Sequence, residues 1–85
     1  MWIQVLYFAV LRERIGKSDE LLELPAGASA GDAIAALTAR YPAVASLQGR
    51  FRVAVGRAFV ADPDRHALAE GDELAIIPPV AGGAM

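Results

Sequence analysis

One amphipathic segment, residues 29–42, constrains the fold more than any other part of the chain. Ser29 is a good helix N-cap, and Asp32 at the third helical position supplies part of a capping box and complements the helix dipole. Pro42 stops the helix. Apolar side chains recur at spacings of four, three and four along one stripe, at Ala30, Ile34, Leu37 and Tyr41. We expect this stripe to pack against a sheet.

The segments before this helix predict strands. Residues 2–8 alternate between one face with Ile3, Val5 and Tyr7 and another with Trp2, Gln4, Leu6 and Phe8. Apolar residues on both faces favour a central strand that is covered on both sides. Residues 9–15 predict a short helix with Gly16 at its C-cap. Residues 20–24 predict a second strand, which Pro25 ends.

The segments after the helix predict shorter strands. Residues 43–49 look irregular, with at most a turn of helix, and residues 52–55 predict a strand. Gly56-Arg57 predicts a tight turn with positive φ at its first residue, and the chain returns over residues 58–60. A polar loop containing one isolated apolar residue, Leu68, leads to a last strand over residues 74–77.

These elements describe a single sheet with one main helix packed across it. A chain of 85 residues holds one domain. The class is α+β, and the β-grasp arrangement, a mixed sheet of four to five strands, is the natural candidate. We expect the domain to span residues 1–79 and a flexible tail to span residues 80–85.

Composition excludes several classes of function. Charged residues or prolines interrupt every apolar stretch before membrane-spanning length, and residues 1–11 lack the positive leader of a signal peptide, so we expect a cytoplasmic protein. The chain has no cysteine and one histidine, His66, which argues against a bound metal. A net charge of −2 argues against nucleic-acid binding.

The last residues have a composition that cannot join a sheet interior. Pro78 and Pro79 remove two amide donors and favour a stiff, extended path out of the last strand. Gly82 and Gly83 have no side chains, so their backbone fits a space too narrow for other residues. From Pro79 to Gly83 such a tail reaches about 13 Å, enough to enter a cleft. The alternative is an ordinary disordered terminus.

Three motifs together resemble one family. Residues 8–13 read Phe-Ala-Val-Leu-Arg-Glu, residues 70–73 read Glu-Gly-Asp-Glu, and residues 78–83 read Pro-Pro-Val-Ala-Gly-Gly. A chain with these motifs at opposite ends is similar to the ubiquitin-like sulfur carriers, and most similar to the small subunits of molybdopterin synthase. The resemblance covers nearly the whole length, and it implies a β-grasp fold.

The resemblance also implies a chemistry. In this family an ATP-dependent activating enzyme adenylates the terminal glycine, sulfur replaces the adenylate, and the thiocarboxylate enters the large subunit to build the dithiolene of molybdopterin. By resemblance Gly83 would carry the sulfur, and the channel would hold Pro78, Pro79, Val80, Ala81 and Gly82. Such a chain is a non-catalytic subunit that binds no cofactor or metal, because ATP is used by its partner.

One departure from the family leaves alternatives open. Family members end at the second glycine, whereas Ala84 and Met85 follow Gly83 here. These residues must be absent or removed before Gly83 can carry sulfur. The alternatives are a β-grasp docking module that transfers no sulfur, and a carrier for another sulfur pathway such as thiamine synthesis.

Four residues are candidates for the partner interface. Phe8, Leu68 and Ile77 are expected to lie away from the helix-packed core, and family members have an apolar docking patch at comparable positions. The alternative is that Phe8 and Ile77 are core residues of a two-faced sheet, which their exposure decides. Arg12 either pairs with a partner carboxylate or remains solvated.

Overall fold

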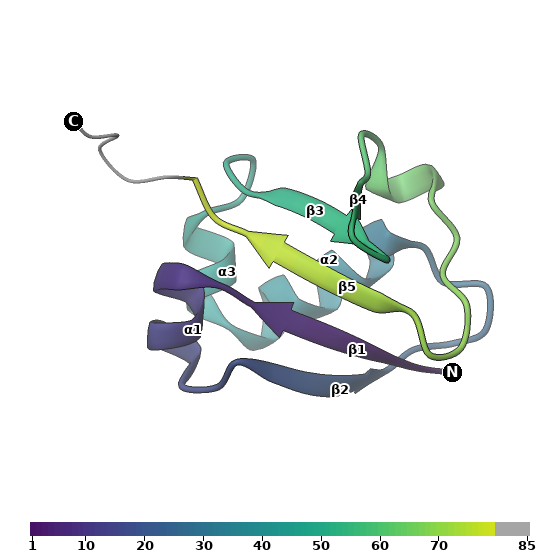
Figure 1. Ribbon diagram of the computed structural model, residues 1–85, viewed down its shortest axis with the longest axis horizontal. Coiled ribbons are helices and arrows are strands. Elements are labelled where there is room, and N and C mark those ends of the chain that lie inside the picture. The colour runs from purple at the N-terminus through teal and green to yellow at the C-terminus, as the bar shows by residue number, and fades with distance from the viewer. Residues whose placement is uncertain (80–85) are drawn as a thin grey trace.

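The structure is a computed structural model that describes residues 1–79 and shows one five-stranded mixed sheet (Figure 1). The predicted tail, residues 80–85, lies outside the described residues, so the boundary at residue 79 remains a prediction. The sheet has the order β2-β1-β5-β3-β4. Its strands are β1 (Trp2–Tyr7), β2 (Asp19–Glu23), β3 (Arg52–Val55), β4 (Ala58–Phe59) and β5 (Glu73–Ile77). The helices are α1 (Ala9–Ile15), α2 (Ala30–Arg40), α3 (Pro42–Ser46) and the 3-10 turn η1 (Pro63–Arg65).

The two strands at the centre of the sheet come from opposite ends of the described chain. β1 pairs with β5 in parallel, whereas β1–β2, β3–β5 and β3–β4 are antiparallel. With α2 packed across one face, this is the β-grasp fold that the sequence predicts. β1 and β5 therefore end at the same edge of the sheet, where Phe8 and Pro78 follow them.

Helix α2 begins and packs as the sequence predicts. The Ser29 side chain accepts a hydrogen bond from the Asp32 amide at 3.1 Å, and the Asp32 carboxylate accepts one from the Ser29 amide at 2.9 Å. Both halves of the capping box are thus present. Leu37 is fully buried against the sheet, together with Ala30 and Ala33, whereas Ile34 and Tyr41 pack at the margin of the core.

Of three loop predictions, two are confirmed and extended, and the one for Leu68 needs correction. Pro42 ends α2 but also begins α3, because proline is tolerated in the first turn of a helix, and α3 contributes the buried Val44. Arg57 has positive φ as well as Gly56, so both turn residues are left-handed. Leu68 is only 6% exposed and belongs to the core, since its amide donates to the Ala28 carbonyl and draws the loop inward.

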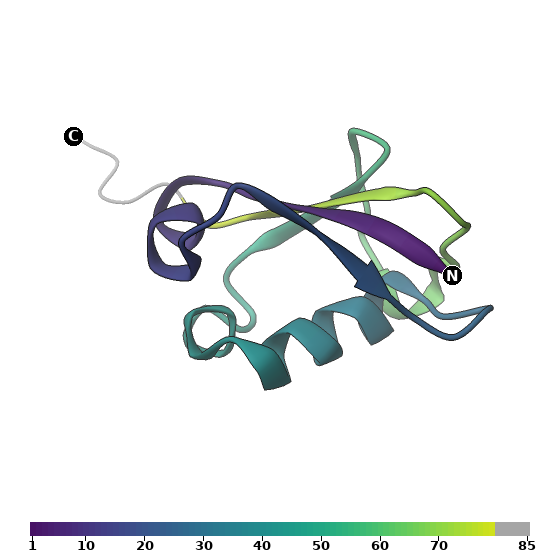
Figure 2. The same ribbon diagram turned by 90° about the horizontal axis from the view of Figure 1, so that it is seen from below.

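One face of the sheet is left uncovered by residues 1–79. Figure 2 shows α2 and α3 on the same side of the sheet, with nothing packed on the other side. β1 is central as predicted, but its second face is open. Large apolar side chains therefore stay exposed, namely Trp2 at 47%, Phe8 at 42%, Leu21 at 63% and Phe59 at 56%.

Candidate functional site

The open face holds a shallow apolar hollow of about 400 Å³ close to the end of β5. We call it the open-face patch, and its lining residues are Leu6, Phe8, Ala54, Arg57, Phe59, Glu73, Ala75 and Ile77. Apolar side chains form most of it, and two charged residues, Arg57 and Glu73, stand among them. Exposed apolar surface that gathers in one place on a small protein is typical of a protein-binding site.

Strand register explains how distant residues meet in the patch. Leu6 pairs with Ala75, and Ala75 in turn pairs with Ala54, so these side chains point to the same face across the central strands. Alternation along β5 then puts Leu74 and Ile76 in the core. Ile77 is turned outward and is partly buried. Neither Ile77 nor Phe8 belongs to the core cluster, and both line the patch.

Phe59 is a patch residue that sequence reasoning missed. It pairs with Ala54 across the β3–β4 hairpin, and this pairing carries its ring to the open face. The available signal was the tight turn at Gly56-Arg57, which fixes the register of the hairpin. Given that register, Phe59 must share a face with Ala54 and Ala75.

The other predicted interface residues have different places. Leu68 is buried on the helix side, so it is not part of an exposed patch, and that prediction is wrong. Arg12 lies on the solvent side of α1, and no carboxylate among residues 1–79 forms an ion pair with it. Its role toward a partner stays a prediction.

The C-terminal segment begins at the patch. Ile77 is both the last residue of β5 and a lining residue of the patch. Pro78 is buried and Pro79 is exposed. The tail positions Val80, Ala81, Gly82 and Gly83, and the two residues that follow them, lie outside the described part of the chain. The fold thus starts the tail beside an exposed apolar surface.

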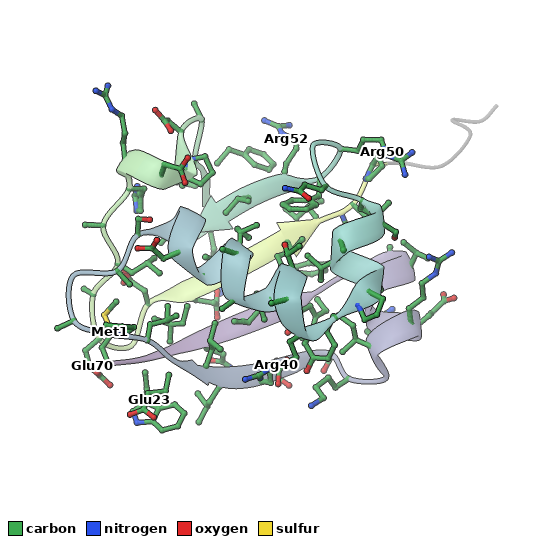
Figure 3. All side chains as sticks on the ribbon, turned by 180° about the vertical axis from the view of Figure 1, so that it is seen from behind. Met1, Glu23, Arg40, Arg50, Arg52 and Glu70 are labelled. Atoms are coloured by element: carbon green, nitrogen blue, oxygen red, sulfur yellow. The ribbon has the colours of Figure 1, made fainter. Side chains whose placement is uncertain are left out.

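A partly buried carboxylate holds the end of β1 from the helix side. Glu20 Oε2 accepts hydrogen bonds from the Tyr7 hydroxyl and, at 2.5 Å, from the Tyr41 hydroxyl. Its Oε1 lies 3.4 Å from Lys17 Nζ and 3.5 Å from Arg40 Nη1. We call these five residues the Glu20 cluster. The Glu20 cluster connects the C-terminal end of α2 with β2 and with β1, which leads to Phe8. Figure 3 shows Arg40 at that end of α2.

The charge state of the Glu20 cluster follows from its contacts. Burial alone would raise the pKa of Glu20, but hydrogen bonds from Tyr41 and Tyr7 and the nearby Lys17 outweigh it and hold that pKa below its ordinary value. Burial and the adjacent Glu20 carboxylate raise the pKa of Tyr7. Glu20 is therefore ionised and Tyr7 is protonated at neutral pH, which is the pairing that the hydrogen bonds need.

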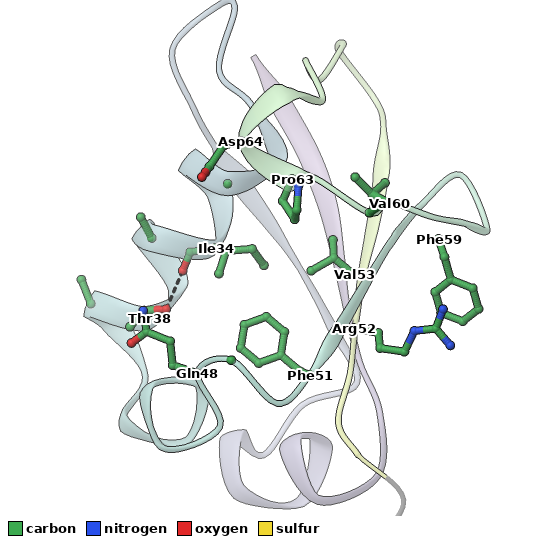
Figure 4. Close-up of a pocket in the computed structure, with 15 residues that line it drawn as sticks. Ile34, Thr38, Gln48, Phe51, Arg52, Val53, Phe59, Val60, Pro63 and Asp64 are labelled. Atoms are coloured by element: carbon green, nitrogen blue, oxygen red, sulfur yellow. Dashed lines mark hydrogen bonds between the residues drawn. The ribbon is translucent and has the colours of Figure 1, made fainter.

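The rest of the described chain offers no competing chemical site. A second groove, of about 980 Å³, lies between α2 and the β3–β4 hairpin and is lined by Ile34, Phe51, Val53 and Pro63 among others (Figure 4). Its Thr38 hydroxyl is already bonded to the Ile34 carbonyl. Within residues 1–79 no group of metal-ligating side chains gathers, and no helix could span a bilayer.

Comparisons with known proteins agree on one family. A model of the ThiS family matches residues 5–83. The molybdopterin synthase sulfur carrier subunit of Chlamydomonas reinhardtii is 42% identical over 83 residues, which span 98% of this chain and 100% of that protein. The subunit of the same name from Mycobacterium tuberculosis is 37% identical over 82 residues, spanning 95% and 96%. The crystal structure of SAMP1 from Haloferax volcanii superposes with a TM-score of 0.83 at 30% identity, covering 98% and 100% of the two chains.

Proposed function

The chain belongs to the ThiS family, and from that premise we propose that it is the sulfur-carrier subunit of molybdopterin synthase, with Gly83 bearing the sulfur. The observation that carries this proposal is the full-length identity of 42% to a protein of that name. The family match extends to Gly83 itself, so it includes both glycines of the tail.

The proposed chemistry needs a free carboxylate at Gly83. A carboxylate is a poor electrophile, so an activating enzyme first transfers AMP from ATP to it and releases pyrophosphate. A sulfur nucleophile then attacks the carbonyl carbon and displaces AMP, which leaves a thiocarboxylate. The large subunit uses this soft anionic sulfur to build the dithiolene. ATP is a substrate of the partner, and this chain supplies only the carboxyl group and its docking surface.

The fold supports this division of labour. The open-face patch offers an apolar surface next to the point where the tail begins. A partner that covers Phe8 and Ile77 is therefore close to the first residues of the tail and can admit the glycines to its own catalytic cleft. We propose that the large subunit and, in turn, the activating enzyme both cover this patch. Each encounter takes place in the cytoplasm.

The two residues after Gly83 give the most direct test. A chain ending at Gly83 and a chain ending at Met85 are each incubated with ATP, the activating enzyme and a sulfur donor, and intact masses are measured. We expect only the Gly83 form to gain the mass difference of sulfur over oxygen. If the Gly83 form stays unmodified by an enzyme that charges a close relative, but still binds the large subunit, the docking-module alternative is the better account.

The patch itself is tested by Ile77→Asp. Because a charge in the desolvated centre of an interface is costly, this change should abolish binding to the large subunit, a loss of at least about a hundredfold. Ile77 is outside the core cluster, so the free protein should keep its fold, as measured by circular dichroism. Unfolding of the isolated variant would show that Ile77 has a core role instead.

A carrier for another sulfur pathway is the remaining alternative, because family membership alone does not choose the acceptor. Reconstitution decides it. The charged Gly83 form is mixed with the large subunit and the cyclic pterin precursor, and dithiolene formation is measured. Failure of transfer from a fully charged chain would favour a different acceptor.

A further inference from the structure

We propose that Arg52, held against the ring of Phe59, makes the open-face patch selective for a partner surface that places a carboxylate beside its apolar contact. This inference rests on the proposed docking of the large subunit at the patch. It adds the chemistry that the subunit must present there.

The position of Arg52 is set by the sheet. Arg52 pairs with Ile77 across β3 and β5, so it stands next to the last residue of β5. Its Cζ lies 3.7 Å from the centre of the Phe59 ring. In Figure 4 Arg52 and Phe59 extend together on the side of β3 away from Phe51. Arg52 itself lines the second groove, whereas Phe59 lines both that groove and the open-face patch, so the pair places a cation at the border of the patch.

This contact prepares the guanidinium for a ligand. Stacking on an aromatic ring uses the face of the guanidinium and leaves the N–H groups at its edge available. No hydrogen bond or ion pair from the Arg52 side chain is formed within residues 1–79. The planar donors match a carboxylate in two-point geometry. Because Phe59 already restricts the side chain, less rotamer freedom is lost on binding.

The charge pattern of the open face gives this contact a direction. Arg52 and Arg57 lie at the β3–β4 end, whereas Asp19 and Glu23 are exposed on β2 at the opposite edge. A partner that places an acidic side chain beside the arginines docks favourably in that orientation. In the reversed orientation the same acidic side chain would face the acidic residues of β2, which repel it. Arg52 therefore contributes to specificity as well as to affinity.

The experiment compares Arg52→Met with Arg52→Lys in a chain ending at Gly83. Both replacements are unbranched and of similar length, so their main difference is charge. Arg65→Met is the control, because the Arg65 side chain is 86% exposed on η1 and, within residues 1–79, pairs only with Asp62, at 3.9 Å. Affinity for the purified large subunit from the same genome is measured by calorimetry at about 50 mM and about 500 mM salt. Thermal midpoints of all variants are recorded.

We expect Arg52→Met to weaken binding about tenfold at low salt and much less at high salt. Arg52→Lys should weaken binding less than Arg52→Met, because lysine keeps the positive charge but lacks the planar two-point donor geometry. The control should bind like the parent. Equal losses in the Met and Lys variants, or binding of Arg52→Met within about twofold of the parent, would overturn the inference.

The same samples separate this inference from the proposed function. Sulfur loading at Gly83 is read by intact mass before each titration. If the parent is loaded with sulfur and binds the large subunit, and Arg52→Met binds equally well, only the role of Arg52 is overturned. A parent that is neither loaded nor bound overturns the carrier assignment, and the inference fails with it.

Discussion

Removing the Glu20 carboxylate should destabilise the fold by about 2–4 kcal/mol. Glu20→Ala leaves the hydroxyl of Tyr7 without its acceptor in a side chain that is 1% exposed. A buried hydroxyl that loses its only partner costs about 1–3 kcal/mol. The Tyr41 hydroxyl is nearer to solvent and can rebond to water, so its loss adds less.

The ion pairs of the cluster contribute little beyond this. The side chains of Lys17 and Arg40 are 46% and 51% exposed, and pairs of this kind contribute about 0–1 kcal/mol each. A domain of 85 residues has a total stability of about 4–13 kcal/mol. Loss of the cluster therefore removes a large share of the free energy of unfolding. Glu20→Gln keeps an acceptor oxygen and should cost less, about 1–2 kcal/mol.

Urea unfolding at neutral pH measures these losses, with Glu23→Ala as the control. Glu23 lies on the same strand but is exposed, and Figure 3 shows it well apart from Arg40. We expect the control to change the free energy of unfolding by less than about 0.5 kcal/mol. A similarly small effect of Glu20→Ala would refute the assignment of the cluster as a stabilising element.

An acid titration tests the same reasoning independently. Burial would raise the pKa of Glu20, but the tyrosine hydrogen bonds and Lys17 outweigh it and hold the folded pKa below the ordinary value of a glutamate. The stability that comes from the ionised carboxylate is thus present above that ordinary pKa and is lost as pH falls through the folded pKa. The gap in stability between the parent and Glu20→Gln should close over that range. A gap that is constant with pH would contradict the sign of the shift.

Three further changes test the packing that positions the patch. Gly31→Ala should destabilise the fold by about 1 kcal/mol, although alanine has the better helix propensity. The added Cβ would lie 1.9 Å from Asp64 Oδ1 and 3.1 Å from Asp64 Cα. Calorimetric melting of this variant, alone and combined with Asp64→Ala, separates the clash with the side chain from the clash with the backbone. Ser29→Ala removes the N-cap of α2 and should lower stability by about 1 kcal/mol with an unchanged urea m-value, whereas an altered m-value would point to a partly unfolded native state. Arg57→Gly relieves a φ of 72° in the hairpin turn and should raise the thermal midpoint, and a lower midpoint would show that Arg57 makes compensating contacts.

Local signals predicted most of the fold because they act over a few residues. Ser29 and Asp32 fix the start of α2, and Gly16, at φ 86°, ends α1 as expected. Leu68 was misplaced because its burial depends on long-range contacts. The neighbouring Ala67 forms a β-bridge with Ser29, and the Leu68 amide bonds to Ala28, so this loop is drawn to the core by residues far away in sequence.

The candidate site was predicted only in part, for the same reason. Phe8 and Ile77 were expected to lie away from the helix-packed core, and both do lie outside the core cluster, whereas their role toward a partner stays a prediction. Phe59 was missed as a patch residue, and its contact with Arg52 was missed too, because both depend on hairpin register and on the pairing of β3 with β5. Apolar residues on both faces of β1 predicted two covered faces, yet the second cover is not within residues 1–79.

The central place of β5 has a consequence for synthesis on the ribosome. β5 lies between β1 and β3, so the sheet cannot close until residue 77 has left the exit tunnel. Before then the nascent chain holds a β1–β2 pair and a β3–β4 hairpin with unsatisfied inner edges, which are prone to wrong pairing. A transcript broken before Glu73 therefore cannot yield a closed sheet.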